Sequence, residues 1–280
     1  MKEMPKTNKY LNSRFIARFT MVGLFFCLTI SQHMLAQPNT TAGIRRWKVN
    51  GTMREAMIYV PLSAKTKPTP VIFLFHGHGG NMQDLFHDHA FEKLWPEAII
   101  VVPQGLMTPG ALVDREGNRS GWQQSLGDQQ DRDLHFFDTI LGSLEKECAV
   151  DKSRIYVAGH SNGAKFVYLL WANRADVLAA VAASAAADTQ LLAQLKPKPV
   201  MQIIGRGDRL VKPAWQLRMV RSFWQLNQCS SPGQPFANLA TMYSSAVGSP
   251  VVVYVHPGGH VYPATADALV ISFFKGIKKE

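Results

Sequence analysis

The chain has 280 residues, of which 46% are hydrophobic and 18% are charged, and only three are cysteines. This composition is typical of a globular protein and excludes a disordered, a collagen-like or a disulfide-stapled chain. The formal net charge is +10, but no basic run is interleaved with aromatic residues, so we do not expect nucleic-acid binding.

The first 36 residues have the pattern of a secretory signal. Five Lys and Arg residues precede residues 19–30, which carry no charge, and residues 31–36 are short and more polar. A bilayer span needs about 20 apolar residues, so we predict a signal peptide over residues 1–36, export to the periplasm or the medium, and no stable membrane anchor. Its removal lowers the formal charge to +6, because five basic residues and Glu3 leave with it.

From residue 45 onward, short apolar runs alternate with helical patterns, which predicts a mostly parallel sheet with helices on both faces. The first two strands form a hairpin that turns near Asn50-Gly51. We predict eight strands, at residues 45–49, 54–60, 71–75, 98–102, 154–158, 178–183, 200–204 and 251–255. We predict four helices, at residues 131–148, 164–172, 215–226 and 266–274. No linker or repeat interrupts the series, so we expect one α/β domain over residues 37–280 and no large lid domain.

One strand runs directly into Gly159-His160-Ser161-Asn162-Gly163 and then into a helix. This pattern is typical of a nucleophile elbow. The turn strains its central residue, and the positions two before and two after it must lack a Cβ atom, as Gly159 and Gly163 do. We therefore predict that Ser161 is a nucleophile at the carboxyl edge of the sheet.

The strand at residues 71–75 ends in a glycine-rich loop that contains His78 and Gly79. Acyl transfer needs two backbone N–H groups that face the developing oxyanion, one after the nucleophile and one from this loop. We assign them to Asn162 and His78, with Gly79 as the alternative donor and as a point where the chain approaches the substrate. A phosphate-binding loop is the competing interpretation, but neither G-x-G-x-x-G nor G-K-[ST] is present.

A serine hydroxyl needs a base, and the base needs a carboxylate to hold it. Only His256 and His260 follow Ser161 along the chain. His256 ends a strand, where a buried structural histidine is the common outcome, so we predict His260 as the base. Asp208 lies on a glycine-flanked loop and is the predicted acid, while Asp188, one strand earlier, is the alternative.

From about residue 58 to residue 277 the sequence resembles the secreted α/β-hydrolase esterases of the polyhydroxybutyrate-depolymerase and feruloyl-esterase-like family. The segments that carry the resemblance are residues 71–81, 101–106, 132–136, 150–163, 207–208 and 258–263. The resemblance implies the α/β-hydrolase fold, with Ser161 as nucleophile, Asp208 as acid and His260 as base.

The resemblance also concerns the substrate pocket. It implies that Trp122, in the long connection before the first long helix, lies near the acyl group. Tyr262 stands where members of the family often have Trp, and Arg132 where many have a second Asp. These two departures concern the shape of the pocket and the identity of the substrate.

Three further patterns have structural interpretations. His87-Asp88-His89 looks like a metal site but lacks a third ligand with suitable spacing, so we predict a polar helix start and no metal. Asp131 and Asp133 are predicted helix caps. Cys148 and Cys229 precede different strands, and a separation above about 7 Å between Cα atoms prevents a disulfide, so we predict two separate thiols.

Together these patterns predict a secreted, monomeric serine esterase that acts through an acyl-enzyme and needs no cofactor. The expected substrates are polymer-borne or bulky esters, such as polyhydroxyalkanoates or feruloyl and acetyl esters of polysaccharides. A serine peptidase with the same three residues, or an inactive polymer-binding module, are the alternatives.

Overall fold

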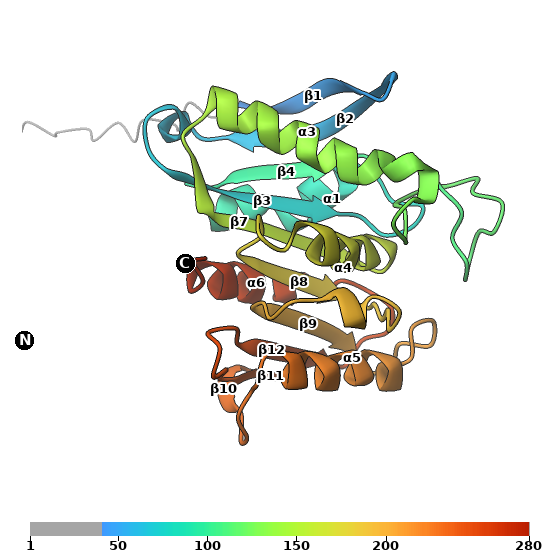
Figure 1. Cartoon of the computed structure of the whole chain (residues 1–280), viewed down its shortest axis with the longest axis vertical. Helices are drawn as coiled ribbons and strands as arrows, with labels where there is room; N and C mark the ends of the chain where they lie inside the picture. The colour runs from blue at the N-terminus through green and yellow to red at the C-terminus, as the bar shows by residue number, and fades with distance from the viewer. Residues whose placement is uncertain (1–40, 280) are drawn as a thin grey trace, which may run out of the picture. The chain divides into compact units, whose positions relative to one another are not determined.

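A ten-stranded sheet forms the centre of the structure, a computed structural model that describes residues 41–279 (Figure 1). Six strands in the middle of the sheet are parallel, and antiparallel strands complete both edges. From one edge to the other the strands are β1 (Thr41–Val49), β2 (Thr52–Val60), β4 (Ile99–Pro103), β3 (Thr69–Phe75), β7 (Val150–His160), β8 (Ala180–Ser184), β9 (Val200–Gly205), β12 (Val251–His256), β11 (Ala240–Tyr243) and β10 (Gln234–Ala237). A separate two-stranded ribbon consists of β5 (Leu106–Met107) and β6 (Ser120–Gly121).

Helices cover both faces of the sheet (Figure 1). One face carries α3 (Arg132–Glu147), α4 (Asn162–Arg174) and α5 (Pro213–Leu226), and the other carries α1 (Met82–His89), α2 (Phe91–Leu94) and α6 (Thr265–Lys275). Every residue of β3, β4, β8 and β9 is buried. Burial on both faces explains why these strands are continuous apolar runs instead of alternating patterns.

All eight predicted strands and all four predicted helices are present. The hairpin turns at Asn50 and Gly51, whose φ values of 46° and 84° lie in the left-handed region that a two-residue turn requires. The expected number of about eight strands was too low, because β10 and β11 were missed. Each has four residues, β10 contains Pro235, and most of their side chains are not buried, so no apolar run marks them.

The sequence His87-Asp88-His89 ends helix α1, so the predicted helix start at this place was wrong. The helix begins one residue after Asn81, whose side-chain oxygen accepts a hydrogen bond from the amide of Asp84. Among residues 41–279 no group of three side chains could hold a metal ion. Cys148 and Cys229 are free thiols, as predicted.

The predicted signal peptide lies outside the described residues. Within the described part of the chain, none of the helices has the length and apolar character needed to span a bilayer. The connection from β8 to β9 spans residues 185–199 and contains the short 3-10 helix Leu192–Gln194.

Candidate active site

The turn between β7 and α4 consists of Ser161 alone, whose φ and ψ are 54° and −115°. A non-glycine residue rarely adopts this backbone conformation. A Cβ atom on Gly159 would lie 2.6 Å from the backbone of Gly163, and one on Gly163 would lie 2.3 Å from the carbonyl oxygen of Phe75. Both positions therefore require glycine, which lets β7, β3 and α4 approach closely enough to form the turn.

The structure brings Ser161, His260 and Asp208 into one hydrogen-bonded series. Ser161 Oγ lies 2.8 Å from His260 Nε2, and His260 Nδ1 lies 2.9 Å from Asp208 Oδ2. The three residues meet because β7, β9 and β12, which precede them, run parallel and end at the same edge of the sheet (Figure 1). The alternative acid, Asp188, accepts a hydrogen bond from the amide of Gln190 and does not pair with His260.

The carboxylate of Asp208 is buried, with 3% of the residue exposed, and is held from several sides. Its Oδ1 accepts hydrogen bonds from the amides of Leu210 and Val211, and its Oδ2 accepts one from Gln216 Nε2. These donors orient Oδ2 toward His260 Nδ1. The imidazole then donates from Nδ1, which leaves Nε2 free to accept the proton of Ser161.

His160 lies beside the imidazole of His260, with 5.0 Å between the ring centroids. Burial, assisted by the neighbouring His260, lowers the pKa of His160 to about 3. His160 is therefore neutral near pH 7 and places no positive charge next to His260. His256, at the end of β12, is buried as predicted.

Two of the predicted oxyanion donors, His78 and Asn162, line the same pocket as Ser161. Asn162 is the first residue of α4, so its amide has no acceptor within the helix. No hydrogen bond of the His78 amide is found among residues 41–279. The amide of Gly79 instead donates to Ser120 O over 2.7 Å, so Gly79 is not available as the alternative donor.

Trp122 lies in the core and not in the pocket, contrary to expectation. It is fully buried between Phe75 and Phe166, and its indole N–H donates to the carbonyl oxygen of His76. The indole ring belongs to the same apolar cluster as these two phenyl rings. The backbone of Trp122 nevertheless supports the site, because its N–H and C=O groups bond to the side chain of Asn162.

Tyr262 does not line the Ser161 pocket. Its ring contacts His89 and His160 and lines a second, smaller pocket next to α1. The hydroxyl is buried and has no hydrogen-bond partner in the described part of the chain, and this burial raises its pKa well above the usual value. The expected contact of Tyr262 with substrate is not supported by its position.

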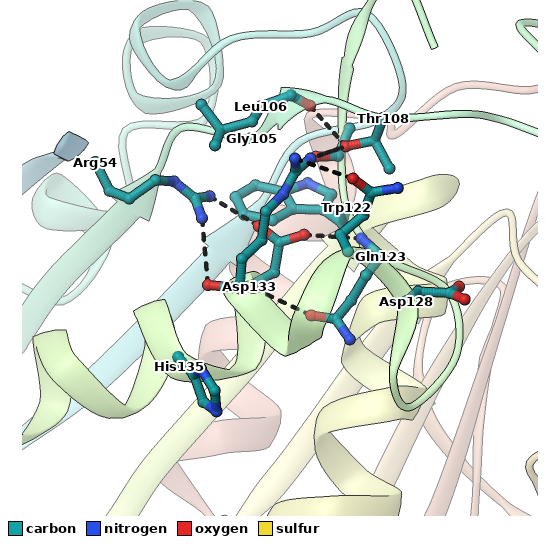
Figure 2. Close-up of polar contacts among 12 residues, drawn as sticks. Arg54, Gly105, Leu106, Thr108, Trp122, Gln123, Asp128, Asp133 and His135 are labelled. Atoms are coloured by element: carbon teal, nitrogen blue, oxygen red, sulfur yellow. Dashed lines mark hydrogen bonds and ion pairs between the residues drawn. The ribbon is translucent and has the colours of Figure 1, made fainter. Parts of the chain in front are cut away.

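A buried ion pair anchors the connection between β4 and α3, which forms one wall of the Ser161 pocket. Figure 2 shows Arg54, on β2, next to Asp133, with 2.8 Å between Nη2 and Oδ1. The other carboxylate oxygen of Asp133 accepts a hydrogen bond from the amide of Gln123. Both side chains of the pair are at most 1% exposed. Loss of either residue would leave the other as an unpaired buried charge, which would destabilise this connection.

Asp131 occupies the N-cap position of α3, but its side chain does not cap the helix, and Asp133 lies inside the helix, so the predicted caps were wrong. Asp133 binds Arg54, and Asp131 accepts hydrogen bonds from Gln123 Nε2 and from the amide of Gly127. Arg132, which stands where the related family often has Asp, donates to Met107 O and Thr108 Oγ1 on the same connection. Arg54 was not predicted from the sequence, although its place in the alternation with Ala56 and Ile58 on β2 was a usable signal.

The pocket at Ser161 is lined mainly by apolar side chains, with His78 and Lys165 as its basic groups. Lys165 was also missed by sequence analysis. It stands four residues after Ser161, at the start of a predicted helix, and this spacing places both on one face.

Comparisons with known proteins give no matching family model. Feruloyl esterase C of Emericella nidulans is 26% identical over 239 residues, which cover 80% of this chain and 81% of that protein. Feruloyl esterase D of Neurospora crassa is 25% identical over 240 residues, or 78% of this chain and 77% of the relative. The chain is similar in sequence to these two feruloyl esterases over most of its length.

Solved structures agree on the fold. A ferulic acid esterase superposes with a TM-score of 0.60 at 18% identity, covering 85% of this chain and 98% of the other. An S-formylglutathione hydrolase from Staphylococcus aureus gives a TM-score of 0.61 at 13% identity, covering 85% and 97%. The chain has the α/β-hydrolase fold, as its resemblance to this class predicted.

Proposed function

We propose that the chain is a secreted serine esterase that hydrolyses carboxylic esters through an acyl-enzyme. The observation that carries this proposal is the hydrogen-bonded series from Asp208 through His260 to Ser161, which stands at a strained turn between a strand and a helix. Similarity to proteins named feruloyl esterases supports an ester as the bond that is cleaved.

In the proposed reaction Ser161 Oγ attacks the ester carbonyl carbon while its proton moves to His260 Nε2. The amides of His78 and Asn162 donate hydrogen bonds to the oxyanion of the tetrahedral intermediate. This intermediate collapses to the acyl-enzyme, and the leaving alcohol takes the proton from His260. Water then attacks the acyl group, with His260 again accepting a proton, and the acid leaves as Ser161 is restored.

The substrates that we propose are polymer-borne or bulky esters, with feruloyl and acetyl esters of polysaccharides as the first candidates. The relatives named feruloyl esterase support the first of these. An acetyl xylan esterase from Aspergillus awamori shares the fold, with a TM-score of 0.60. Polyhydroxyalkanoates stay a prediction from the sequence, as do the signal peptide over residues 1–36, the single domain over residues 37–280 and the monomeric state.

A fluorophosphonate probe tests the mechanism, because it phosphonylates a serine only when a base activates its hydroxyl. We expect labelling at Ser161, detected by mass spectrometry of the digested protein. The Ser161→Ala variant should lose the label and about 10⁶-fold in kcat on p-nitrophenyl acetate while keeping its fold. An Ala variant that retains more than a few per cent of the rate would place the nucleophile elsewhere.

A further inference from the structure

The pocket at Ser161 combines apolar walls with one lysine. Apolar side chains come from the connection before α3 and from the loops after β8 and β9, among them Leu112, Val113, Ala186, Leu210 and Val211. Lys165 reaches the same pocket from the second turn of α4, and its side chain is half-buried. No Asp or Glu among the described residues lines this pocket.

Lys165 has unused hydrogen-bonding capacity. An ammonium group has three donors, and among the described residues Lys165 Nζ makes one hydrogen bond, to Gln124 Oε1 over 3.2 Å. Gln124 is neutral, and within residues 41–279 Lys165 takes part in no ion pair. A charged group in partly apolar surroundings is stabilised by a partner of opposite charge, and residues 41–279 supply none here.

Asp114, on the loop that forms the pocket wall, does not neutralise this charge. Its carboxylate lies 3.0 Å from His78 Nε2. It also accepts hydrogen bonds from the backbone amides of Gly117, Asn118 and Arg119. Asp114 itself does not line the pocket. Its role is to shape the wall loop, so the positive charge at Lys165 is left for a ligand.

The pocket lies on the acyl side of the scissile bond. The leaving alcohol takes its proton from His260 Nε2, so the alcohol must lie next to that nitrogen. His260 does not line the pocket, whereas Ser161 and the two oxyanion donors do. The acyl group therefore occupies the pocket, which Lys165, one helical turn after Ser161, also lines.

We propose that the acyl group of the substrate carries a carboxylate and that Lys165 recognises it. The substrate class is thus a half-ester of a dicarboxylic acid with a short carbon chain between its carboxyl groups. This inference rests on the proposed esterase function, but it changes the acyl group proposed there, because feruloyl and acetyl groups carry no free carboxylate. Lys165 determines specificity and does not take part in bond cleavage.

The test compares two substrates that differ only in charge, 4-nitrophenyl hydrogen glutarate and its neutral methyl ester. We expect the wild-type protein to have the higher kcat/KM on the anionic ester, with a preference that shrinks at high salt. In Lys165→Met the ratio of the two kcat/KM values should fall about tenfold to a hundredfold, the worth of a hydrogen bond to a charged group. Lys165→Arg should retain most of the preference.

The matched control is Lys152→Met, which removes the same charge from a side chain that is 72% exposed and pairs with Glu145. It should leave the ratio unchanged. A ratio that is equally unchanged in Lys165→Met would overturn the proposal, while hydrolysis of the neutral ester would still support the esterase.

A calorimetric titration separates the two proposals. Glutarate should bind the wild-type protein and bind Lys165→Met at least tenfold more weakly. A protein that hydrolyses neither ester but shows this difference would contradict the esterase and support the lysine site. Equal binding to both proteins would contradict the lysine site.

Discussion

His260 needs a carboxylate at Nδ1, and Asp208 is the side chain that the structure puts there. Asp208→Asn should lower kcat about 10⁴-fold, because an amide NH₂ at this place favours the tautomer with the proton on Nε2, which cannot accept from Ser161. Asp188→Asn should keep nearly full activity, since Asp188 bonds only locally to Gln190. Rates of both variants on p-nitrophenyl acetate check this, and a reversed order would identify Asp188 as the acid.

A second residue-scale prediction concerns His76, which is 2% exposed. Its Nδ1 bonds to Gly77 O and its Nε2 accepts from the amide of Gly105, so the ring is neutral in the folded protein. Burial lowers its pKa from 6.5 to about 4. Below about pH 6.5 the unfolded chain binds a proton at His76 that the folded protein does not bind. The free energy of unfolding should therefore fall as the pH is lowered from about 6.5 to about 4.

The contribution of His76 is at most about 1.4 kcal/mol per pH unit. Urea denaturation at pH 7 and pH 5 measures it, and His76→Gln should lose less stability on acidification than the wild type. His87→Gln, which replaces an exposed histidine on α1, is the control and should behave as the wild type. Equal slopes in all three proteins would contradict the prediction.

At the scale of elements, the contact of α4 with β3 depends on a glycine. A Cβ atom on Gly163 would lie 2.3 Å from Phe75 O, whereas one on Gly142, in α3, would meet nothing within 4 Å. Gly163→Ala should therefore destabilise the protein by about 1–3 kcal/mol or more and displace Ser161. Gly142→Ala should stabilise it by about 0.4–1 kcal/mol, because the unfolded chain loses freedom.

Urea denaturation of the two variants checks this pair, together with fluorophosphonate labelling of Ser161. The two substitutions add the same methyl group to a helix, so a difference in stability reflects the close approach at the elbow. Similar stabilities, or full labelling of Gly163→Ala, would show that β3 and α4 can separate without cost.

At the scale of the whole molecule, the sheet edge that carries Ser161, Asp208 and His260 is complete within residues 41–279. A chain that lacks residues 1–36 should therefore fold and hydrolyse p-nitrophenyl acetate at the rate of the exported protein. The exported protein should have a mass that corresponds to cleavage at or within a few residues of Ala36. Export of all 280 residues, or inactivity of the shortened chain, would contradict the signal-peptide prediction.

The sequence by itself determined the features that short segments encode. The strands buried on both faces are continuous apolar runs, and the hairpin turn has the residues that positive φ requires. The elbow was also recognisable, because Gly159 and Gly163 flank Ser161 at the spacing that steric contact demands. Ser161, Asp208 and His260 could be selected as partners because each follows a predicted strand, and parallel strands end at the same edge of a sheet.

Only the tertiary structure decided which side chains from distant segments of the chain contact each other. Trp122 packs between Phe75 and Phe166, distant in sequence, so its place in the core had no local signal. Likewise Asp133 resembled a helix cap, and its partner Arg54 is 79 residues away. The loops that line the pocket bring no carboxylate to Lys165. This arrangement depends on contacts between segments that are distant in sequence, so no local pattern of residues reveals it.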